Sequence, residues 1–207
     1  MQKYICKHCD NLECKTSVCT VCGNRTELVE TSVFYCEKCN VPVFDQECSL
    51  CNSVCKRIGS DVRPVFAKER LLIEILLDKP FEFAGKSVWC ATPNNYYVDG
   101  KKIKFSFSSV KNKNVIEVIN KLNLYENRNK KYEEHDLDNE YIKRFISCNK
   151  YRLIEITEEA TNYIQKVASG FDQTSMFVSF SGGKDSSATS NLVMKSLNSN
   201  KVIHIYG

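Results

Sequence analysis

Eight cysteines near the N-terminus form four Cys-x2-Cys pairs, a spacing suited to metal binding. One such turn aims two thiolates at a point, and a second turn completes a tetrahedral tetrathiolate site. The pairs repeat as two units, because the first pair recurs after 30 residues and the second after 29. The pattern therefore predicts two metal sites, with zinc as the expected ion and iron as the alternative in the same geometry. The predicted ligands are Cys6, Cys9, Cys19 and Cys22 at one site and Cys36, Cys39, Cys48 and Cys51 at the other.

Each cysteine unit is too short to fold on apolar burial alone. A chain of about 25–30 residues buries little apolar surface, so metal binding must supply the folding free energy. We therefore expect two zinc ribbons, over 1–30 and 31–60, with structural and interaction roles. Residues 1–60 carry seven basic and seven acidic side chains, which argues against a polyanion as the partner of the ribbons.

Four cysteines and one histidine of this region and beyond fall outside the pairs. We expect them to be bystanders, although Cys55 can compete with Cys51 for a metal. The first residues are polar and cysteine-bearing, unlike an export signal, so a disulfide framework is not favoured. Scattered structural or redox thiols are the alternative interpretation. The five residues are His8, Cys14, Cys55, Cys90 and Cys148.

A glycine pair near the C-terminus is the second feature that can do chemistry. Two glycines allow the backbone to turn tightly and to approach a polyphosphate. A helix that begins there favours an anion at its first amides, and Lys184 adds positive charge. Asp185 suits a helix N-cap, or an indirect contact with Mg²⁺ through water. The predicted phosphate-binding residues are Ser181, Gly182, Gly183, Lys184, Asp185, Ser186 and Ser187.

The elements around this loop form a recognisable order over 175–207. The apolar run 176–180 predicts a buried parallel strand, and 188–197 predicts a helix. After a turn at 198–200, residues 201–206 predict a second strand. This β-loop-α-β order is the right-handed crossover unit of doubly wound sheets. The loop lacks the spacing of a Walker A motif, and a glycine connection before a serine-capped helix is the alternative interpretation.

A small α+β module is predicted over 62–125. Helical apolar spacing, ended by Pro80, is followed by short strand-like runs. Asp99-Gly100 between two such runs is a strong hairpin signal. The predicted elements are a linker at 61–64, a helix at 65–77, strands at 87–91, 95–98 and 103–107, and a helix at 115–124.

Aromatic and basic residues of this module admit two interpretations. The aromatic side chains form the core of a small sheet, or they stack on bases while lysines hold phosphates. The aromatic residues are Trp89, Tyr96, Tyr97, Phe105 and Phe107. The stretch 101–131 is the place where RNA contact is expected, because it is strongly basic. Its basic residues are Lys101, Lys102, Lys104, Lys111, Lys113, Lys121, Arg128, Lys130 and Lys131, against the acidic Glu117 and Glu126.

A helical segment is predicted to connect the module to the glycine loop. The second half of 111–138 is rich in Asn, Lys and Glu, which predicts a surface connection. Apolar residues then recur every three or four positions over 136–170, which predicts one long amphipathic helix or two in succession. Asp136 or Asp138 can cap its start, and Gly170 lies at its end.

The overall composition is that of a soluble globular protein, with 43% hydrophobic and 26% charged residues. No apolar run approaches the length that crosses a bilayer. We therefore expect a cytoplasmic protein of several small domains, without a membrane partner.

The glycine loop and its flanks resemble a known family. SGGKDS after an apolar strand resembles the PP-loop of the ATP pyrophosphatase superfamily. Phe177 to Ser186, with Ile203 to Gly207, is similar to the phosphoadenosine phosphosulfate (PAPS) reductase family. The cysteine ribbons and the segments RPVFAKERLLIEILL, GKSVW and YYVDGKKIKFS resemble archaeal-type members of that family, so the resemblance spans nearly the whole chain.

The resemblance implies an enzyme that binds an adenine nucleotide, ATP or PAPS, in sulfur metabolism. Its fold would be a parallel-sheet α/β domain of the adenine nucleotide alpha hydrolase type, with Ser181 to Ser186 around the phosphates. The chemistry would be adenylylation with pyrophosphate release, or a reaction of a phosphosulfate. No catalytic residue is assigned.

One departure from the family concerns the C-terminus. The family domain continues for several strands, whereas this sequence stops at Gly207, before the adenine-binding residues and the cysteine motif of thiol-dependent reductases. The expectation is a truncated chain, or one that a second polypeptide completes, with little activity alone. Two other functions stay open: an enzyme that thiolates tRNA through an adenylylated intermediate, and a non-catalytic zinc-ribbon scaffold.

Overall fold

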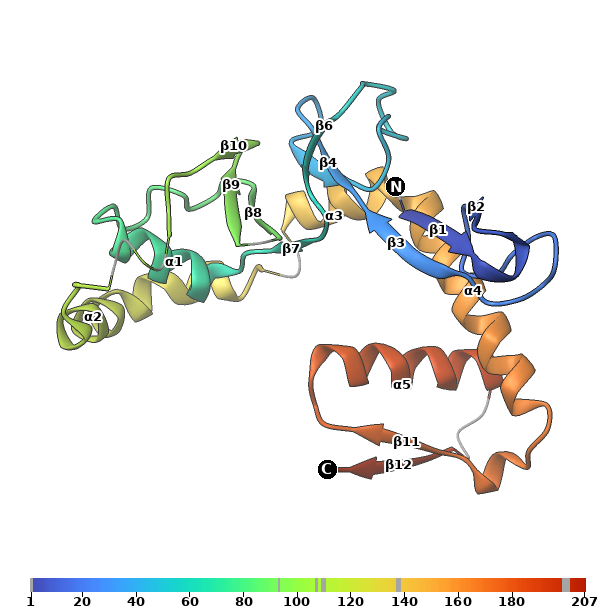
Figure 1. Cartoon of the computed structure of the whole chain (residues 1–207). Coiled ribbons are helices and arrows are strands. Elements are labelled where there is room, and N and C mark those ends of the chain that lie inside the picture. Colours follow the sequence, from blue (N-terminus) through green and yellow to red (C-terminus); the bar gives the residue numbers. More distant parts are fainter. Residues whose placement is uncertain (1, 93, 107, 109–110, 137–138, 199–201) are drawn as a thin grey trace. The chain divides into compact units, whose positions relative to one another are not determined.

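The computed structural model describes residues 2–92, 94–106, 108, 111–136, 139–198 and 202–207. Contacts divide the chain into two compact units, Met1–Asn149 and Lys150–Gly207. The described residues form a mixed α+β fold with five α-helices and four small sheets (Figure 1). In this described part, the helices are too short or too polar to traverse a lipid bilayer.

The two cysteine units fold into sheets of the same plan. In each, the first strand lies in the centre and pairs antiparallel with the second and the third. The central strand ends at the first cysteine of the first pair; in the first unit the second cysteine of that pair lies in a short 3-10 helix, η1 (Lys7–Cys9). The strands are β1 (Gln2–Cys6), β2 (Leu12–Cys14) and β3 (Glu27–Thr31), then β4 (Val33–Cys36), β5 (Val41–Val43) and β6 (Lys56–Gly59).

The repeat extends to the turn that carries the second cysteine pair. The amide of Cys19 donates to the carbonyl of Asn24 at 2.8 Å, and the amide of Cys48 donates to that of Ser53 at 3.0 Å. An isolated antiparallel bridge closes each turn, between Val18 and Arg25 in one unit and at the equivalent position in the other. The two ribbons therefore share their hydrogen bonding as well as their strand order.

The ribbons differ in what covers them. In the first ribbon, Cys6, Cys19 and Thr26 are the buried residues among those whose side chains are described. The second ribbon instead belongs to a core that includes side chains from distant parts of the unit. Its buried members are Phe34, Tyr35, Cys36, Cys39, Val41, Val43, Cys48, Cys55, Trp89 and Cys148.

A four-stranded antiparallel sheet and one helix follow the second ribbon. The strand order is β10-β9-β8-β7, and α1 packs on one face, where Val65, Ile73 and Tyr96 are buried. Residues 62–64 form an edge strand, so the predicted linker at 61–64 is wrong; Pro64 is tolerated there because an edge strand leaves amides unpaired. The elements are β7 (Val62–Pro64), α1 (Ala67–Leu76), β8 (Val88–Ala91), β9 (Asn95–Val98) and β10 (Lys101–Lys102).

The hairpin at Asp99-Gly100 is present, but its second strand is Lys101–Lys102, so the strand predicted at 103–107 is wrong in position and in length. Pairing with β9 ends after Lys102, so residues 103–106 are not a strand, and Phe107 lies outside the described residues. The amide of Phe105 donates to the carbonyl of Ile103 at 3.0 Å, which bends the chain. This bend brings the Phe105 ring to 5.4 Å from that of Tyr96.

Helix α2 (Val115–Glu133) is longer than the helix predicted at 115–124. The second half of 111–138 is therefore mostly helical, and the predicted surface connection is wrong. Contacts with α1 explain the difference, because Asn129 of α2 is 1% exposed and accepts a hydrogen bond from Arg70 of α1. The Asn114 side chain caps the start of the helix.

The segment after α2 forms two helices in succession, α3 (Glu140–Cys148) and α4 (Lys150–Ala168). Asn139 caps α3, whereas Asp136 binds the amide of Ala67 at the start of α1; Leu137 and Asp138 lie outside the described residues. The first unit ends at Asn149, whose side chain accepts from the Phe44 amide at 2.9 Å and donates to the Pro42 carbonyl at 3.1 Å. These bonds attach the end of α3 to the second ribbon.

The second unit consists of α4, η3 (Gln173–Ser175), β11 (Phe177–Phe180), α5 (Lys184–Leu197) and β12 (Ile203–Tyr206). The two strands are parallel, with Phe177 opposite Ile203, and α5 connects them as predicted. Ser199 to Lys201, in the predicted turn and at the start of the predicted strand, lie outside the described residues. Val178 is buried on the face that α5 covers.

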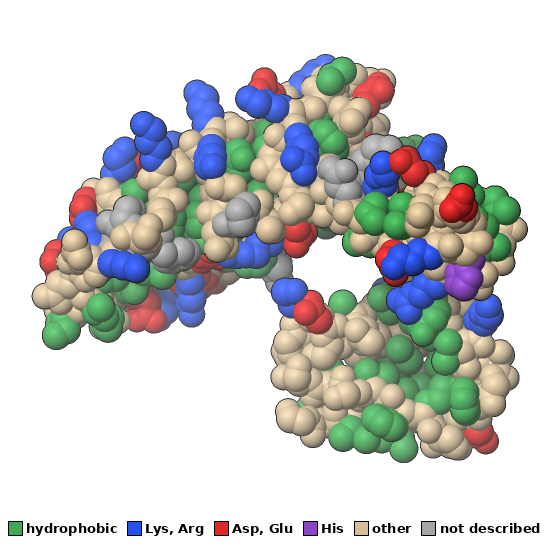
Figure 2. All heavy atoms as spheres, viewed as in Figure 1, with side chains coloured by type: hydrophobic (Ala, Val, Ile, Leu, Met, Phe, Trp, Pro, Cys, Tyr) green, Lys and Arg blue, Asp and Glu red, His purple; other side chains and the backbone are tan. Residues whose placement is uncertain are grey.

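The opposite face of the parallel strands is apolar and exposed. Phe177, Ile203 and Ile205 alternate with buried or polar neighbours and are 63%, 54% and 48% exposed. Figure 2 shows hydrophobic side chains at the surface of this unit. Parallel strands normally bury both faces, so this pair has an uncovered side.

Candidate functional site

The four thiols of each ribbon converge on one point. In each group the four sulfur atoms all lie within 4.8 Å of one another, and the two groups contain the eight predicted ligands. In the first ribbon, two of the sulfur–sulfur distances are 3.5 Å from Cys6 to Cys22 and 3.9 Å from Cys9 to Cys19. In the second ribbon they are 3.4 Å from Cys36 to Cys51 and 3.8 Å from Cys39 to Cys48.

These distances fit a tetrahedral metal ion. Zinc bound to thiolates at about 2.3 Å places the sulfur atoms at the corners of a tetrahedron with edges of about 3.8 Å. The observed pairs scatter around that edge length, from 3.4 to 3.9 Å. Two tetrathiolate groups that can hold metal ions, compatible with zinc, are therefore present.

The two cysteine pairs of a ribbon differ in the pKa of their thiols. In the first ribbon, amides of Cys22 and Val21 lower the pKa of Cys19 to about 6, because they stabilise its thiolate. A hydrogen bond with Cys22, together with burial, raises the pKa of Cys9 to about 12. The second turn thus supplies a ready thiolate, while the first turn must release a proton when a metal binds.

The second ribbon shows the same contrast. A hydrogen bond with the hydroxyl of Ser53 lowers the pKa of Cys51 to about 6. Burial raises the pKa of Cys36 and that of Cys39. The agreement between the ribbons indicates that the protonation pattern belongs to the repeat.

The thiols outside the pairs do not join either group. Cys55 and Cys148 are buried beside the second ribbon, and the sulfur of Cys55 donates to the Ser53 carbonyl at 3.2 Å. Cys90 lies in the core under α1, and Cys14 donates to the carbonyl of Leu12. His8 is likewise absent from both thiol groups.

Helix α3 supports the second ribbon from outside the metal site. The Arg144 guanidinium donates to the carbonyl of Cys39 at 3.3 Å, and Ser49 donates to the carbonyl of Cys148. The Phe145 ring lies 4.9 Å from the ring of Trp89. The sequence pattern of the ribbons carries no signal for these contacts, since α3 is about 100 residues away along the chain.

The glycine loop lies between β11 and α5, as predicted. Gly183 is the N-cap of α5 and offers no capping side chain, so the first amides of the helix lack a side-chain partner. Gly182 has a φ of +74°, a conformation that favours glycine. An added Cβ would meet open space at Gly182 and, at Gly183, only Ser181 Oγ at 3.6 Å. The loop is therefore an exposed turn with free space beside both glycines.

The side chains of the loop are mostly exposed. Lys184 pairs with Asp185 at 2.6 Å, both at the surface, so Asp185 is not the N-cap. Ser181 Oγ donates to Ser186 Oγ at 3.3 Å, and Ser186 Oγ donates to the Gly183 carbonyl at 3.0 Å. Two of the predicted hydroxyls thus lie together at the helix start, while the Ser187 side chain is exposed.

Part of the basic stretch 101–131 is neutralised within the protein. Lys113 and Lys121 both pair with Asp78 at the end of α1. The Arg128 guanidinium lies 4.0 Å from the centre of the Phe81 ring. By contrast, the lysines of the hairpin are exposed and have no acidic partner in the described residues; they are Lys101, Lys102 and Lys104.

The aromatic residues of the module are mainly core. Trp89 and Tyr96 are 1% and 2% exposed, and the Tyr97 hydroxyl donates to the Ile58 carbonyl at 3.1 Å. Stacking on bases would need exposed rings, so the core interpretation is the better one for these residues.

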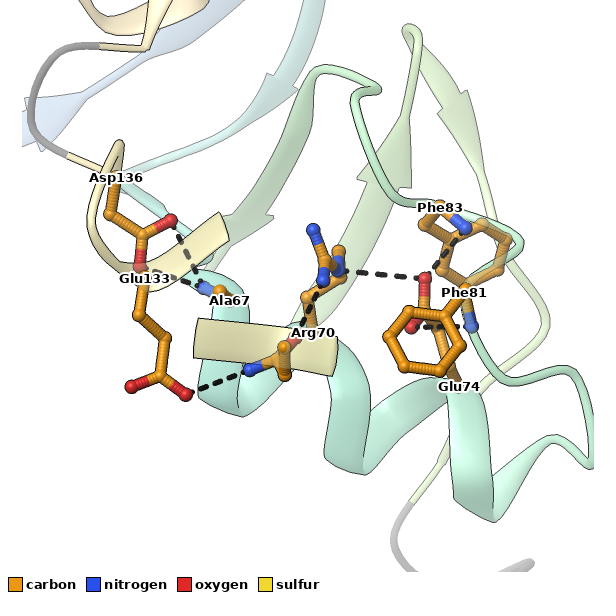
Figure 3. A network of polar contacts seen from close by, with 8 residues as sticks. Ala67, Arg70, Glu74, Phe81, Phe83, Glu133 and Asp136 are labelled. Carbon is orange, nitrogen blue, oxygen red and sulfur yellow. Dashed lines mark hydrogen bonds and ion pairs between the residues drawn. The ribbon is translucent and has the colours of Figure 1, made fainter. Parts of the chain in front are cut away.

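A buried polar network on α1 was not predicted. Arg70 and Glu74 are both buried, 3.6 Å apart, and Figure 3 shows the amides of Phe81 and Phe83 directed at the Glu74 carboxylate. The sequence does contain a signal for this pair. Arg70 and Glu74 are four residues apart inside the apolar run ERLLIEILL, and charged residues on a buried helix face are normally paired.

Comparison with known proteins identifies no relative of this chain. No protein-family model, no curated protein and no solved structure matches the chain.

Proposed function

We propose that the chain binds an adenine nucleotide, ATP or PAPS, through its phosphates at the loop 181–187. The activity would be that of a PP-loop protein similar to PAPS reductases, in adenylylation or sulfonucleotide chemistry. The observation that carries the proposal is the helix start at Gly183, which presents backbone amides without a side-chain cap between two parallel strands. Such a helix start favours a phosphate group.

The loop side chains suit the same ligand. Lys184 supplies an exposed ammonium, and Ser181 and Ser186 hold hydroxyls beside the first turn of α5. Asp185 lies in that first turn, where it would contact Mg²⁺ of a metal–nucleotide complex through water. The space that a Cβ would occupy at Gly182 is open to a phosphate oxygen.

The exposed face of β11 and β12 belongs to the proposal. A nucleotide site at the carboxyl end of parallel strands normally lies in a larger sheet with both faces covered. We propose that further sheet elements or a second polypeptide cover Phe177, Ile203 and Ile205. In this proposal the ribbons bind two zinc ions as structural modules, and the protein acts in the cytoplasm.

Replacing Gly183 by valine tests the nucleotide site. The backbone at Gly183 is extended, with φ −79° and ψ 168°, so valine fits without strain. Its side chain would occupy the phosphate position, and we expect affinity for Mg·ATP or PAPS to fall by about tenfold or more through loss of charge-assisted hydrogen bonds. Amide chemical shifts during titration measure the affinity.

The matched control is Gly170→Val, a glycine of the same unit whose added Cβ would come no closer than 4.0 Å to the Val167 carbonyl. This variant should bind as the unchanged protein does. Equal affinity of Gly183→Val and Gly170→Val would contradict the proposed site. Bound metal without any nucleotide affinity would favour the non-catalytic scaffold.

A second candidate function, binding and thiolation of tRNA, is favoured by the hairpin. Lys101, Lys102 and Lys104 are exposed and lack acidic partners in the described residues, as free cations at a phosphate-binding surface would. We expect tRNA binding, if this function holds, to weaken as salt rises and to weaken further when these three lysines become glutamine. Absence of tRNA binding at low salt would exclude it.

A further inference from the structure

A cavity of about 270 Å³ lies in the first unit, apart from the ribbons and the glycine loop. The start of α1, residues at the beginning of β8, and His135, Asp136 and Asn139 between α2 and α3 contribute to its walls. Its volume is slightly below the 300–1,000 Å³ or so of drug-sized ligand sites, which suits a small metabolite. We call it the Arg70 pocket, and its walls include Val65, Arg70, Lys86, Val88, Asp136 and Tyr141.

Arg70 is the buried charge of this pocket. The residue is 6% exposed, and the face of its guanidinium lies 4.6 Å from the centre of the Tyr132 ring. Its Nη2 donates to Asn129 at 2.8 Å, and its Nε lies 3.6 Å from the Glu74 carboxylate. These contacts engage one ring face and Nη2, whereas the buried Nε faces Glu74 without a hydrogen-bond partner in the described residues.

The third nitrogen of Arg70, Nη1, has no partner in the described part of the chain. Figure 3 shows a terminal guanidinium nitrogen without a dashed line, directed away from Glu74. Nη1 does not belong to the fully buried polar atoms that have no hydrogen-bond partner. It therefore has access to space, and the pocket that Arg70 lines supplies that space.

The lining of the pocket carries two cations, Arg70 and Lys86, and two carboxylates, Asp136 and Glu140. Asp136 already accepts from the Ala67 amide at 3.0 Å, and Glu140 pairs with Arg144. Lys86 also lines the pocket; its ammonium lies 5.8 Å from the centre of the Phe83 ring and has no carboxylate partner in the described residues. Glu140 is thus neutralised by Arg144, Asp136 is held by the Ala67 amide, and Lys86 and the Nη1 edge of Arg70 keep donors for a ligand.

We propose that the Arg70 pocket binds a small organic anion, a carboxylate or a phosphate monoester. Arg70 Nη1 and Lys86 Nζ hold the anionic group, because cationic donors make the stronger hydrogen bonds to such groups. Val65 and Val88 lie against its apolar part. This site is separate from the proposed nucleotide loop, which belongs to the other unit.

Three small probes test this proposal on the zinc-loaded full chain. Phenyl phosphate and benzoate differ in the anionic group, and phenol is the neutral control. We expect one or both anions to shift the amide resonances of Gly85, Asn139 and Tyr141 in a saturable manner at constant ionic strength. The anion that binds more tightly identifies the ligand class.

Lys86→Met should weaken this binding by about tenfold, the effect of one charge-assisted hydrogen bond. Lys79→Met is the matched control, since Lys79 is an exposed lysine paired with Glu82 and does not line the pocket. Shifts confined to Gly182 and Gly183 would report the glycine loop and overturn the pocket proposal. Equal binding of phenol, or an unchanged affinity in Lys86→Met, would also overturn it.

Discussion

Loss of one cysteine ligand in the first ribbon is expected to unfold that ribbon alone. Loss of one ligand in the second ribbon is expected to destabilise the whole core around it. Cys9→Ser and Cys39→Ser change equivalent positions of the repeat, each in the first cysteine pair of its ribbon. Both variants should retain one metal ion per chain instead of two. The structural consequences should differ, because the ribbons differ in how they are held.

The first ribbon is expected to depend on a bound metal ion for its folding. Cys6, Cys19 and Thr26 are its buried residues among the side chains described, so little apolar burial remains without the ion. Structural zinc contributes about 10–16 kcal/mol in ribbon-sized peptides, comparable with the whole stability of a domain at about 5–15 kcal/mol. Cys9→Ser should therefore disorder residues 2–31 and leave the rest of the unit folded.

The second ribbon shares its core with the adjacent sheet and helix. Phe34, Val41 and Val43 pack with Trp89 and Cys148, and Phe145 packs against this cluster. Loss of the metal there removes the support of the shared core, so Cys39→Ser should lower the melting temperature of the first unit as a whole. Apolar contacts from α3 and the sheet should leave a collapsed remnant.

The single tryptophan of the chain reports the difference. Trp89 is 1% exposed in the shared core, so its fluorescence should shift to longer wavelength in Cys39→Ser and stay unchanged in Cys9→Ser. Cys14→Ser is the control, since Cys14 lies outside both thiol groups and should leave two metal ions bound. The same emission shift in both ligand variants would contradict the unequal support of the ribbons.

The features that sequence reasoning predicted are those with local causes. The eight thiols come together because each pair and its turn are short segments, and the glycine loop lies between its strand and helix for the same reason. The second ribbon has almost the same local pattern as the first. Its different burial could not be predicted, since α3 covers it through Arg144 and Asn149, about 100 residues later.

Two incorrect element predictions have the same origin. The polar composition after Leu124 indicates a surface connection, but Asn129 is buried against Arg70, 59 residues away, and the helix continues. Residues 61–64 have the composition of a linker, but Arg63 pairs with Cys90 in a sheet. Contacts with residues distant in sequence determine both elements, and hydrophobic periodicity does not reveal such contacts.

Arg70→Met is expected to be the most damaging single change in the α1 region, at about 3–5 kcal/mol of unfolding free energy at neutral pH, because it leaves a buried carboxylate without its cation. Glu74 is fully buried, and Arg70 is the cation beside it. Methionine fills most of the volume of arginine but removes the hydrogen bond to Asn129. Chemical denaturation measures the loss.

Replacing Glu74 as well should recover part of the unfolding free energy that Arg70→Met loses. Burial raises the pKa of Glu74 above its usual value even with Arg70 present, so the neutral form of this side chain suits its surroundings. Arg70→Met with Glu74→Gln should therefore be more stable than Arg70→Met alone. Glu117→Gln, an exposed residue paired with Lys121, is the control and should have little effect.

The pH dependence separates charge from packing in this network. Without Arg70, the pKa of Glu74 should rise further, and the folded state then binds a proton that the unfolded state releases at lower pH. Stability of Arg70→Met should therefore fall as pH rises through the folded-state pKa of Glu74, and recover when the carboxyl is protonated. The double variant should lack this slope, because glutamine does not titrate. If both variants show the same pH profile and the same stability, the loss comes from packing around α1 and not from the ion pair within it.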